Sequence, residues 1–328
     1  MRQRWGFLGT GRVTNRMVQA VAQSQSSSLV AIASRSVERA HQWIIRQHLH
    51  ESAIGILTMG SYRELIQTPG IDWIYNALPP SCHFEYSAEA LLAGKNVLCE
   101  KPLCLNATEA SELQAIAVRT GRRLVHATAF PHHPRSHASR KLILAGEIGD
   151  VRRVTMACTF VDAFRRENEH RVDPMLGGGC LLDLGWYCVA ATMWLTDLTV
   201  KSMQVTGSKR MGVWESVQAL ATLSNGAIAH WDCGFDTASR KWIEVAGTEG
   251  SWICDDFIRP WDNAKPRYWL HGHAGKSTAE LIGEDFFQEA AMIDACCNAP
   301  DEWITSQMDQ AVEIHCVLDA LDVAAVVP

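Results

Sequence analysis

Three features of the sequence could do chemistry: a glycine-containing turn at residues 9–14, a lysine at residue 101, and an aspartate and a tyrosine four positions apart at residues 183 and 187. The turn follows a short apolar run and opens an amphipathic stretch, so its backbone N–H groups could approach a pyrophosphate at the positive end of a helix. Lys101 follows the run Asn96–Cys99 and is separated from it only by Glu100. We therefore expect it at the carboxyl end of a strand, where open α/β sheets bind their ligands.

The turn at residues 9–14 carries only two of the three glycines of the dinucleotide-binding fingerprint, because Thr14 stands at the third position. After the next expected strand an NAD site usually has a carboxylate for the ribose hydroxyls, but this sequence has Ser34, Arg35 and Ser36. Arg35 and the serine hydroxyls could hold a 2′-phosphate, which favours NADP and leaves NAD as the alternative. In a second interpretation Arg35 is a solvated residue and Ser36 only caps the following helix.

These residues need a sheet to position them, and the N-terminal part of the chain predicts one. Short apolar runs alternate there with amphipathic stretches, which is typical of parallel strands joined by helices. We expect strands at 5–8, 29–33, 56–58, 73–77, 96–99 and 123–127, and helices at 12–23, 37–47, 84–93 and 107–120 with another starting at Tyr62. The predicted N-terminal domain, residues 1–126, is a doubly wound parallel sheet of the Rossmann type.

The pattern changes after residue 126. A helix at 136–145 precedes long runs separated by turn signals, which favours antiparallel strands at 151–161, 199–206, 215–223, 227–235 and 242–245. Further helices are expected at 181–195, 284–297 and 308–323. The predicted fold class is therefore α/β, with a second α+β domain at residues 127–328 that has a large, mainly antiparallel sheet and serves substrate binding and oligomerisation.

Composition limits the class of partner. The 30 Lys and Arg against 36 Asp and Glu give a net charge of −6, which offers no broad basic field for nucleic acid. The apolar run at residues 5–8 is too short for a signal peptide or a membrane span, so we expect a cytoplasmic protein with no membrane partner. The 11 Cys show no C-x-x-C pair, which fits a reducing compartment. The 13 His show no H-x-x-x-H pair on a helix together with a carboxylate, so no metal site is expected.

Several motifs together resemble one family. Glu-Lys-Pro at 100–102, the run from Gly177 to Tyr187, Ala-Gly-Glu-Ile-Gly-Asp-Val at 145–151 and Gly-Thr-Glu-Gly-Ser at 247–251 resemble the glucose-fructose oxidoreductase, inositol dehydrogenase and MocA (Gfo/Idh/MocA) family. The resemblance implies hydride transfer between a nicotinamide and a hydroxyl or carbonyl group of a small polyhydroxylated substrate, a sugar, cyclitol or dihydrodiol. The alternatives are reduction of a keto-sugar on a nucleotide carrier, or a dinucleotide-sensing protein without turnover.

The resemblance places Lys101, Asp183 and Tyr187 in the substrate site, which is then expected between the two domains. Asp183 and Tyr187 share one face of the expected helix. A nearby Lys ammonium would favour the phenolate of Tyr187 for acid/base work, while Lys101 would donate to the developing alkoxide and Asp183 would orient the substrate or the lysine. The alternative is that Asp183 forms a local salt link and Tyr187 only packs.

The resemblance also marks the cofactor contacts. Pro79 and His83 match a segment that borders the nicotinamide ribose, although Leu78 and Pro80 replace the usual Thr and Asn. In the alternative, His83 only begins a helix and contacts no ligand. The full set of expected cofactor contacts is Gly9, Gly11, Arg12, Val13, Ser34, Arg35, Pro79, His83, Glu100 and Lys101.

Oligomerisation is expected through the C-terminal sheet, as a homodimer or homotetramer. Strand alternation places Ala227, Ala229, Trp231, Cys233 and Phe235 on one face, which is a candidate subunit contact. The alternative is that this face packs on the helices of its own domain.

Overall fold

The computed structural model describes residues 2–47, 55–161, 163–165, 169–260, 265–272, 275, 277–281 and 287–326. The chain forms two compact units: unit 1 comprises Met1–Thr128 with Phe287–His315, and unit 2 comprises Ala129–Phe286 with Cys316–Pro328. A C-terminal segment thus belongs to the compact unit of the N-terminal residues. The boundary between the two functional domains, placed after residue 126, stays a prediction.

Unit 1 contains the predicted doubly wound sheet. Its six strands run parallel in the order β3-β2-β1-β4-β5-β6. They are β1 (Gln3–Leu8), β2 (Ser27–Ala33), β3 (Leu57–Met59), β4 (Trp73–Asn76), β5 (Asn96–Cys99) and β6 (Leu124–His126). The order reverses between β1 and β4, and such a switch point is where doubly wound sheets bind ligands.

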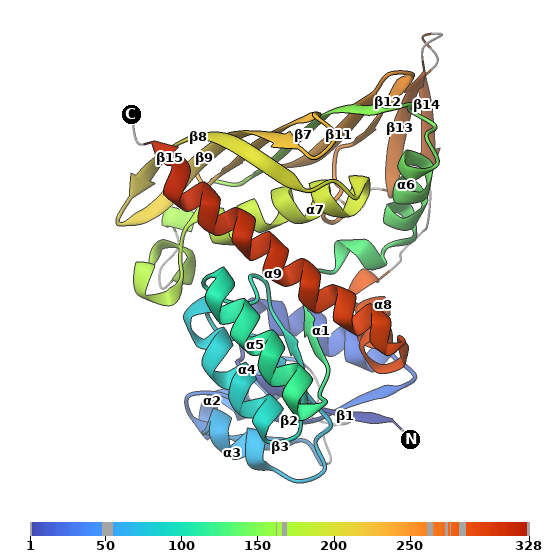
Figure 1. Cartoon of the computed structure of the whole chain (residues 1–328). Coiled ribbons are helices and arrows are strands. Elements are labelled where there is room, and N and C mark those ends of the chain that lie inside the picture. The colour runs from blue at the N-terminus through green and yellow to red at the C-terminus, as the bar shows by residue number, and fades with distance from the viewer. Residues whose placement is uncertain are drawn as a thin grey trace. The chain divides into compact units, whose positions relative to one another are not determined.

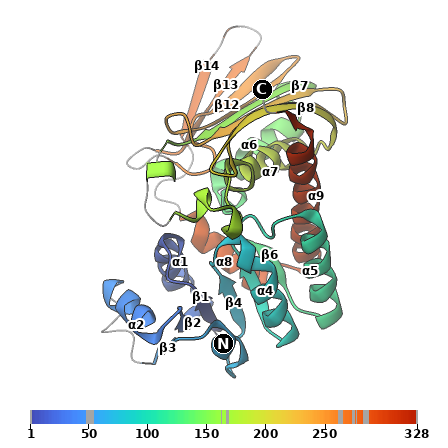
Figure 2. The same ribbon diagram turned by 90° about the vertical axis from the view of Figure 1, so that its left-hand side faces the viewer.

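Helices cover both faces of this sheet. Figure 2 shows α1 and α2 on one side of the strands and α4 and α5 on the other. The helices of unit 1 are α1 (Arg12–Gln23), α2 (Val37–Arg46), α3 (Tyr62–Gln67), α4 (His83–Leu92), α5 (Ala107–Thr120), α8 (Gln288–Asn298) and the first part of α9 (Asp301–Ala324). The helix predicted from Glu284 begins at Gln288, and residues 284–286 lie outside the described residues.

The strands β1, β4, β5 and β6 of unit 1 are largely buried, as parallel strands between two helical layers must be. Trp5 on β1 pairs in register with Trp73 on β4, and their rings stack with centroids 5.0 Å apart. Phe7 and Tyr75, two residues further along, meet edge to face at 4.9 Å. These aromatic pairs pack β1 against β4, near the turns that follow both strands.

Unit 2 is built on a nine-stranded sheet in the order β14-β13-β12-β11-β7-β10-β9-β8-β15. Only the pairs β7–β10 and β8–β15 are parallel, so the predicted mainly antiparallel sheet is confirmed. Its strands are β7 (Val151–Thr159), β8 (Val200–Arg210), β9 (Val213–Leu223), β10 (Ile228–Gly234), β11 (Arg240–Gly247), β12 (Gly250–Cys254), β13 (Arg267–Gly272), β14 (Ser277–Leu281) and β15 (Ala325–Val326). Strands β12, β13 and β14 were not predicted.

Helices α6 (Pro134–Leu144) and α7 (Trp186–Thr196) lie on one face of this sheet (Figure 1). Trp231 of β10 donates from its indole nitrogen to the Thr192 hydroxyl of α7 at 2.9 Å. The face that carries Trp231 is buried: Ala227, Ala229, Trp231, Cys233 and Phe235 are each at most 2% exposed. The expectation that this face is a subunit contact was therefore wrong, because the unit's own helices cover it.

Within the described residues, one helical stretch, Pro174–Thr196, is long and apolar enough to cross a membrane, with a mean hydropathy of 1.2 over 18 residues. It includes α7, whose residues are nearly all buried against the sheet of unit 2. Its apolar character is accounted for by packing in the core of this unit.

Candidate active site

The turns that carry the predicted cofactor contacts adjoin one another at the carboxyl edge of the unit 1 sheet. Gly9 follows β1, Ser34 follows β2, Pro79 lies in the turn after β4, and Glu100 follows β5. Backbone hydrogen bonds join neighbouring turns, from Gly9 N to Ala33 O (3.0 Å), from Ala77 N to Leu8 O (3.1 Å) and from Glu100 N to Asn76 O (2.9 Å). The structure thus brings the predicted cofactor residues of unit 1 to a single edge.

The turn between β1 and α1 has the form that a pyrophosphate requires. Gly9 has φ +100°, and a Cβ there would lie 3.1 Å from the carbonyl oxygen of Ala77, so a side chain fits neither the backbone angle nor the space. Gly11 precedes α1 in extended conformation and provides no side-chain cap to its first turn. Arg12 and Val13 are exposed in that turn. This open helix start suits an anionic group.

The replacement of the third glycine by Thr14 is accommodated inside the unit. Thr14 is fully buried, and its hydroxyl donates to the carbonyl oxygen of Gly11 one turn earlier. The side chain therefore satisfies its own polar group and leaves the exposed side of the turn unobstructed.

The residues after β2 divide between the two interpretations of the sequence. Ser34 is buried, and its hydroxyl lies 3.2 Å from the hydroxyl of Thr10 in the glycine turn. Ser36 caps α2 by accepting from the backbone N–H of Arg39, as in the second interpretation. Arg35 is exposed. Burial raises the pKa of Tyr62 while Arg35 and Arg39 lower it, so both guanidinium groups lie near the same phenol.

Glu100 is held by a residue that the sequence did not single out. The Tyr75 hydroxyl donates to Glu100 Oε1 at 2.6 Å, and the backbone N–H of Lys101 donates to Glu100 Oε2 at 3.3 Å. Complete burial, followed by the charge of Glu100, raises the pKa of Tyr75 well above its usual value, so its hydroxyl keeps its proton. Tyr75 and Glu100 together position the backbone from which Lys101 projects.

His83 is a positioning residue in this structure. Its side chain is nearly completely buried, with Nδ1 2.7 Å from the carbonyl oxygen of Pro102 and Nε2 2.7 Å from that of Leu78. The ring therefore connects the turn after β4 to the segment that follows Lys101. The side chain is 1% exposed and supports the residues around it, and its contact with a cofactor stays a prediction.

In unit 2, Asp183 belongs to a small ion-pair network that is centred on Arg171. Arg171 donates from Nε to Asp183 Oδ2 at 2.7 Å and from Nη1 to Glu169 Oε1 at 2.8 Å. Burial alone would lower the pKa of Arg171, but the two carboxylates raise it above its usual value. Asp183 therefore does form the local salt link that was the alternative to a catalytic role. Its action on a substrate stays a prediction.

The glycine run before Asp183 allows this network to form. A Cβ at Gly178 would lie 2.6 Å from the carbonyl oxygen of Arg171, which only glycine allows. Asp183 lies in the π-helical turn Leu181–Gly185, and Tyr187 is the second residue of α7, which continues it. Such π turns occur frequently at functional sites. Tyr187 is half-buried.

Lys101 belongs to unit 1, whereas Asp183 and Tyr187 belong to unit 2. Their joint action stays a prediction. Sequence reasoning missed Tyr75, Arg171 and Glu169, because each reaches its partner through folding and not through a local motif. Within the described part of the chain, no group of three or more His, Cys, Asp or Glu side chains could hold a metal ion.

Comparison with known families addresses both units. Residues 3–128 match the family model described as an oxidoreductase family with an NAD-binding Rossmann fold, and residues 137–253 match the GFO/IDH/MocA C-terminal domain. The chain belongs to the Gfo/Idh/MocA family of oxidoreductases. The resemblance stated from the motifs is confirmed, and with it the assignment of the chain as an enzyme.

Members of the Gfo/Idh/MocA family with a named activity are similar over most of the chain. A dTDP-3,4-didehydro-2,6-dideoxy-alpha-D-glucose 3-reductase of Saccharopolyspora spinosa is 32% identical over 78% of this chain and 76% of its own length. A D-xylose 1-dehydrogenase (NADP(+)) of Haloferax volcanii is 30% identical over 75% and 74%. Among solved structures, a 3-ketoreductase from Actinomadura kijaniata in complex with NADP and TDP-benzene matches with a TM-score of 0.86 and 25% identity, over 100% of this chain and 99% of that one.

Proposed function

We propose that this chain is an NADP-dependent oxidoreductase that acts on a hydroxyl or carbonyl group of a small polyhydroxylated substrate. The observation that carries the proposal is the glycine turn at Gly9, which leads into the open start of α1 and adjoins the turn that carries Arg35. When bound, the nicotinamide would donate or accept the hydride. Relatives named as an NADP(+)-dependent xylose dehydrogenase and as a deoxysugar 3-reductase support the substrate class.

In this proposal the protein's side chains handle the proton and the oxygen. Lys101, whose backbone is fixed by Glu100 and Tyr75, would donate a hydrogen bond to the substrate oxygen on which charge develops. Tyr187 would give a proton to that oxygen during reduction and take one during oxidation. Asp183, oriented by Arg171, would hold a neighbouring hydroxyl group of the substrate.

The proposed function is tested with a panel of free sugars, cyclitols, dihydrodiols and nucleotide-linked sugars, followed through NADPH absorbance in both directions. We expect turnover of at least one class with NADP(H). NADPH that binds without turnover of any class would instead support the dinucleotide-sensing alternative.

Replacement of Arg35 by alanine is expected to raise the KM for NADP about 10- to 100-fold and to change the KM for NAD little. A charge-assisted hydrogen bond to the 2′-phosphate contributes about 1.5–3 kcal/mol, and NAD has no such phosphate. Steady-state kinetics with both cofactors measures the change. Arg46→Ala, which removes another exposed arginine at the far end of α2, is the matched control. An unchanged NADP-to-NAD preference in Arg35→Ala would contradict the assignment.

We also propose a homodimer or homotetramer formed through the face of the unit 2 sheet opposite its helices. Leu220 of β9 is 51% exposed on that face and pairs in register with the exposed His230 of β10. In sedimentation at micromolar concentration we expect the mass of two or four chains, and Leu220→Glu should shift it toward one. A monomeric wild-type chain would refute the proposal. The eleven cysteines include no C-x-x-C pair, which supports a reducing, cytoplasmic location.

A further inference from the structure

The segment 100–105, which carries Lys101, is hydrogen-bonded to the C-terminal part of the chain. The backbone N–H of Cys104 donates to Nε2 of His315 at 3.1 Å, across 211 positions of the sequence. His315 lies on α9 and, like Cys104, belongs to unit 1. We infer that His315 is a positioning residue, which holds Lys101 in place for the reaction. The inference rests on the proposed function and adds to it a residue that no motif of the sequence marks.

The hydrogen bond between Cys104 and His315 is enclosed in the interior of unit 1. Both residues are 0% exposed. Bulk water therefore does not reach the Cys104 N–H, and the imidazole is the acceptor that satisfies it. A buried backbone N–H that loses its acceptor is costly, so the backbone around it shifts toward another partner. Removal of the ring nitrogen should thus displace the segment 100–105.

The ring of His315 is in the state that such an acceptor requires. Burial, followed by the charges of His126 and His83, lowers the pKa of His315 to about 3. Burial also lowers the pKa of His126, to about 4. Both rings are therefore neutral near pH 7. A neutral imidazole has one N–H and one acceptor nitrogen, so Nε2 of His315 accepts while Nδ1 carries the proton.

The backbone between Cys104 and Lys101 has little freedom to absorb a displacement. Only Pro102 and Leu103 stand between the two residues. The ring of Pro102 fixes its own φ, and its carbonyl oxygen lies 2.7 Å from Nδ1 of His83. Leu103 is 1% exposed. A shift of the backbone at Cys104 is therefore transmitted to Lys101.

The expected effect is on the chemical step and not on dinucleotide binding. A catalytic group displaced by about 1 Å can lose about 100-fold in rate. The residues proposed to hold the phosphates, Gly9 and Arg35, follow β1 and β2, whereas the segment 100–105 follows β5. Loss of the His315 acceptor should therefore lower kcat and leave the KM for NADP nearly unchanged.

The test compares three substitutions of His315 in the full chain. His315→Leu removes the acceptor, His315→Gln keeps an acceptor as far from the backbone as Nε2, and His315→Asn places one only as far as Nδ1. The substrate is D-xylose, D-glucose, myo-inositol or dTDP-glucose, whichever the wild-type chain turns over fastest with NADP(H). We expect kcat about 10- to 100-fold lower for the Leu and Asn variants and within about threefold of wild type for the Gln variant. The KM for NADP should stay within about twofold in all three.

A double variant shows whether His315 acts through Lys101. His315→Leu should cause little further loss of kcat when it is added to Lys101→Ala, because the side chain that it positions is then absent. Ile304→Ala is the matched control for lost stability, since Ile304 is a buried residue of α9 about three turns before His315. It should lower the urea midpoint without lowering kcat.

The outcomes separate the inference from the proposed function. Wild-type kcat in folded Leu and Asn variants, or an equal loss from His315→Leu with and without Lys101, would overturn the inference alone. Circular dichroism checks folding, and the Asn variant replaces the Leu variant in the double variant if the latter does not fold. Absence of hydride transfer by the wild-type chain with every compound of the substrate panel would overturn the proposed function and the inference together.

Discussion

Replacement of Tyr187 by phenylalanine is expected to lower kcat by roughly 100- to 10,000-fold, the usual contribution of a positioned general acid or base. The change removes only a hydroxyl from a half-buried ring at the start of α7, so the packing of unit 2 should be retained. Stopped-flow or steady-state NADPH absorbance measures the rate, and KM should change far less than kcat. Lys101→Ala is expected to reduce the rate to a similar extent.

The double variant distinguishes joint action from separate roles. If Lys101 and Tyr187 serve the same hydride transfer, the loss in the double variant should be little larger than in either single one, because groups that act as a unit are not additive. Tyr86→Phe is the matched control, since that ring meets Tyr62 edge to face in unit 1. A Tyr187→Phe variant with wild-type turnover would remove this residue from the proposed chemistry.

The sheet of unit 1 was predictable because its signals are local. Each parallel strand is a short apolar run followed by a polar turn and an amphipathic helix, and the glycine turn marks the first crossover. The start of α9 was placed too late, at residue 308 instead of Asp301. The signals for the earlier start were present, because Pro300 precedes Asp301 and Glu302, and acidic residues favour the first turn of a helix.

The strands of unit 2 were harder to predict, because their pairing is not local. The central pair, β7 with β10, is parallel and joins residues 153–159 to 228–234, which are far apart in the sequence. The hairpin between β8 and β9 turns at Met211 and Gly212, both with positive φ, and the usual Asn-Gly signal for such a turn is absent. The end of β8 and the strands β12 to β14 were not predicted.

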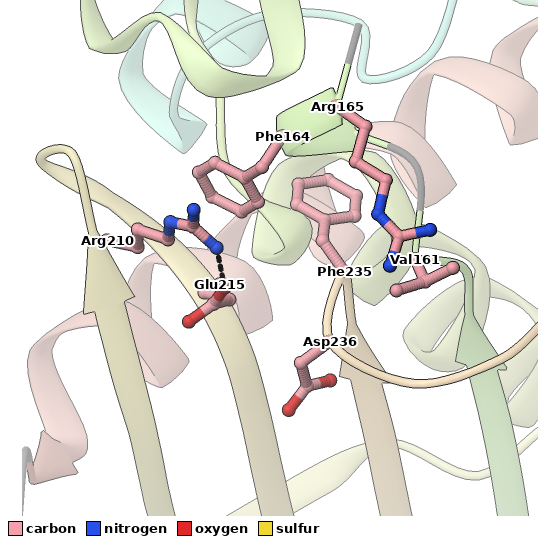
Figure 3. A pocket seen from close by; sticks show the side chains of 7 residues that line it. All are labelled: Val161, Phe164, Arg165, Arg210, Glu215, Phe235 and Asp236. Carbon is pink, nitrogen blue, oxygen red and sulfur yellow. Dashed lines mark hydrogen bonds and ion pairs between the residues drawn. The ribbon is translucent and has the colours of Figure 1, made fainter.

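The candidate site residues also differ in whether the local sequence reveals them. Gly9, Lys101, Asp183 and Tyr187 stand in motifs that local sequence reveals. Partners such as Tyr75 for Glu100 and Arg171 for Asp183 become visible only when the sheet or the turns before α7 bring them together. A cavity of about 260 Å³ in unit 2 (Figure 3) is the extreme case, since its lining extends from residue 161 to residue 236 without a shared motif.

The ion pair between Arg135 and Asp256 is expected to be a large contributor to the stability of unit 2. Both side chains are 0% exposed. The guanidinium of Arg135, at the start of α6, bonds Asp256 Oδ1 and also donates to the carbonyl oxygens of Asp256 (3.1 Å) and Phe257 (3.0 Å). Asp256→Ala leaves this charge buried with its carboxylate removed. Such a change costs about 3–5 kcal/mol of the free energy of unfolding.

Urea denaturation followed by near-ultraviolet circular dichroism measures this loss, as a lower midpoint with an unchanged slope. The surface pair of Arg152 and Asp150, 55% and 77% exposed, is the matched control, and Asp150→Asn should cost less than about 1 kcal/mol. The double variant Arg135→Met, Asp256→Leu should recover most of the loss, because no buried charge remains to be compensated. A midpoint for Asp256→Ala equal to that of Asp150→Asn would show that the buried pair contributes no more than a solvated one.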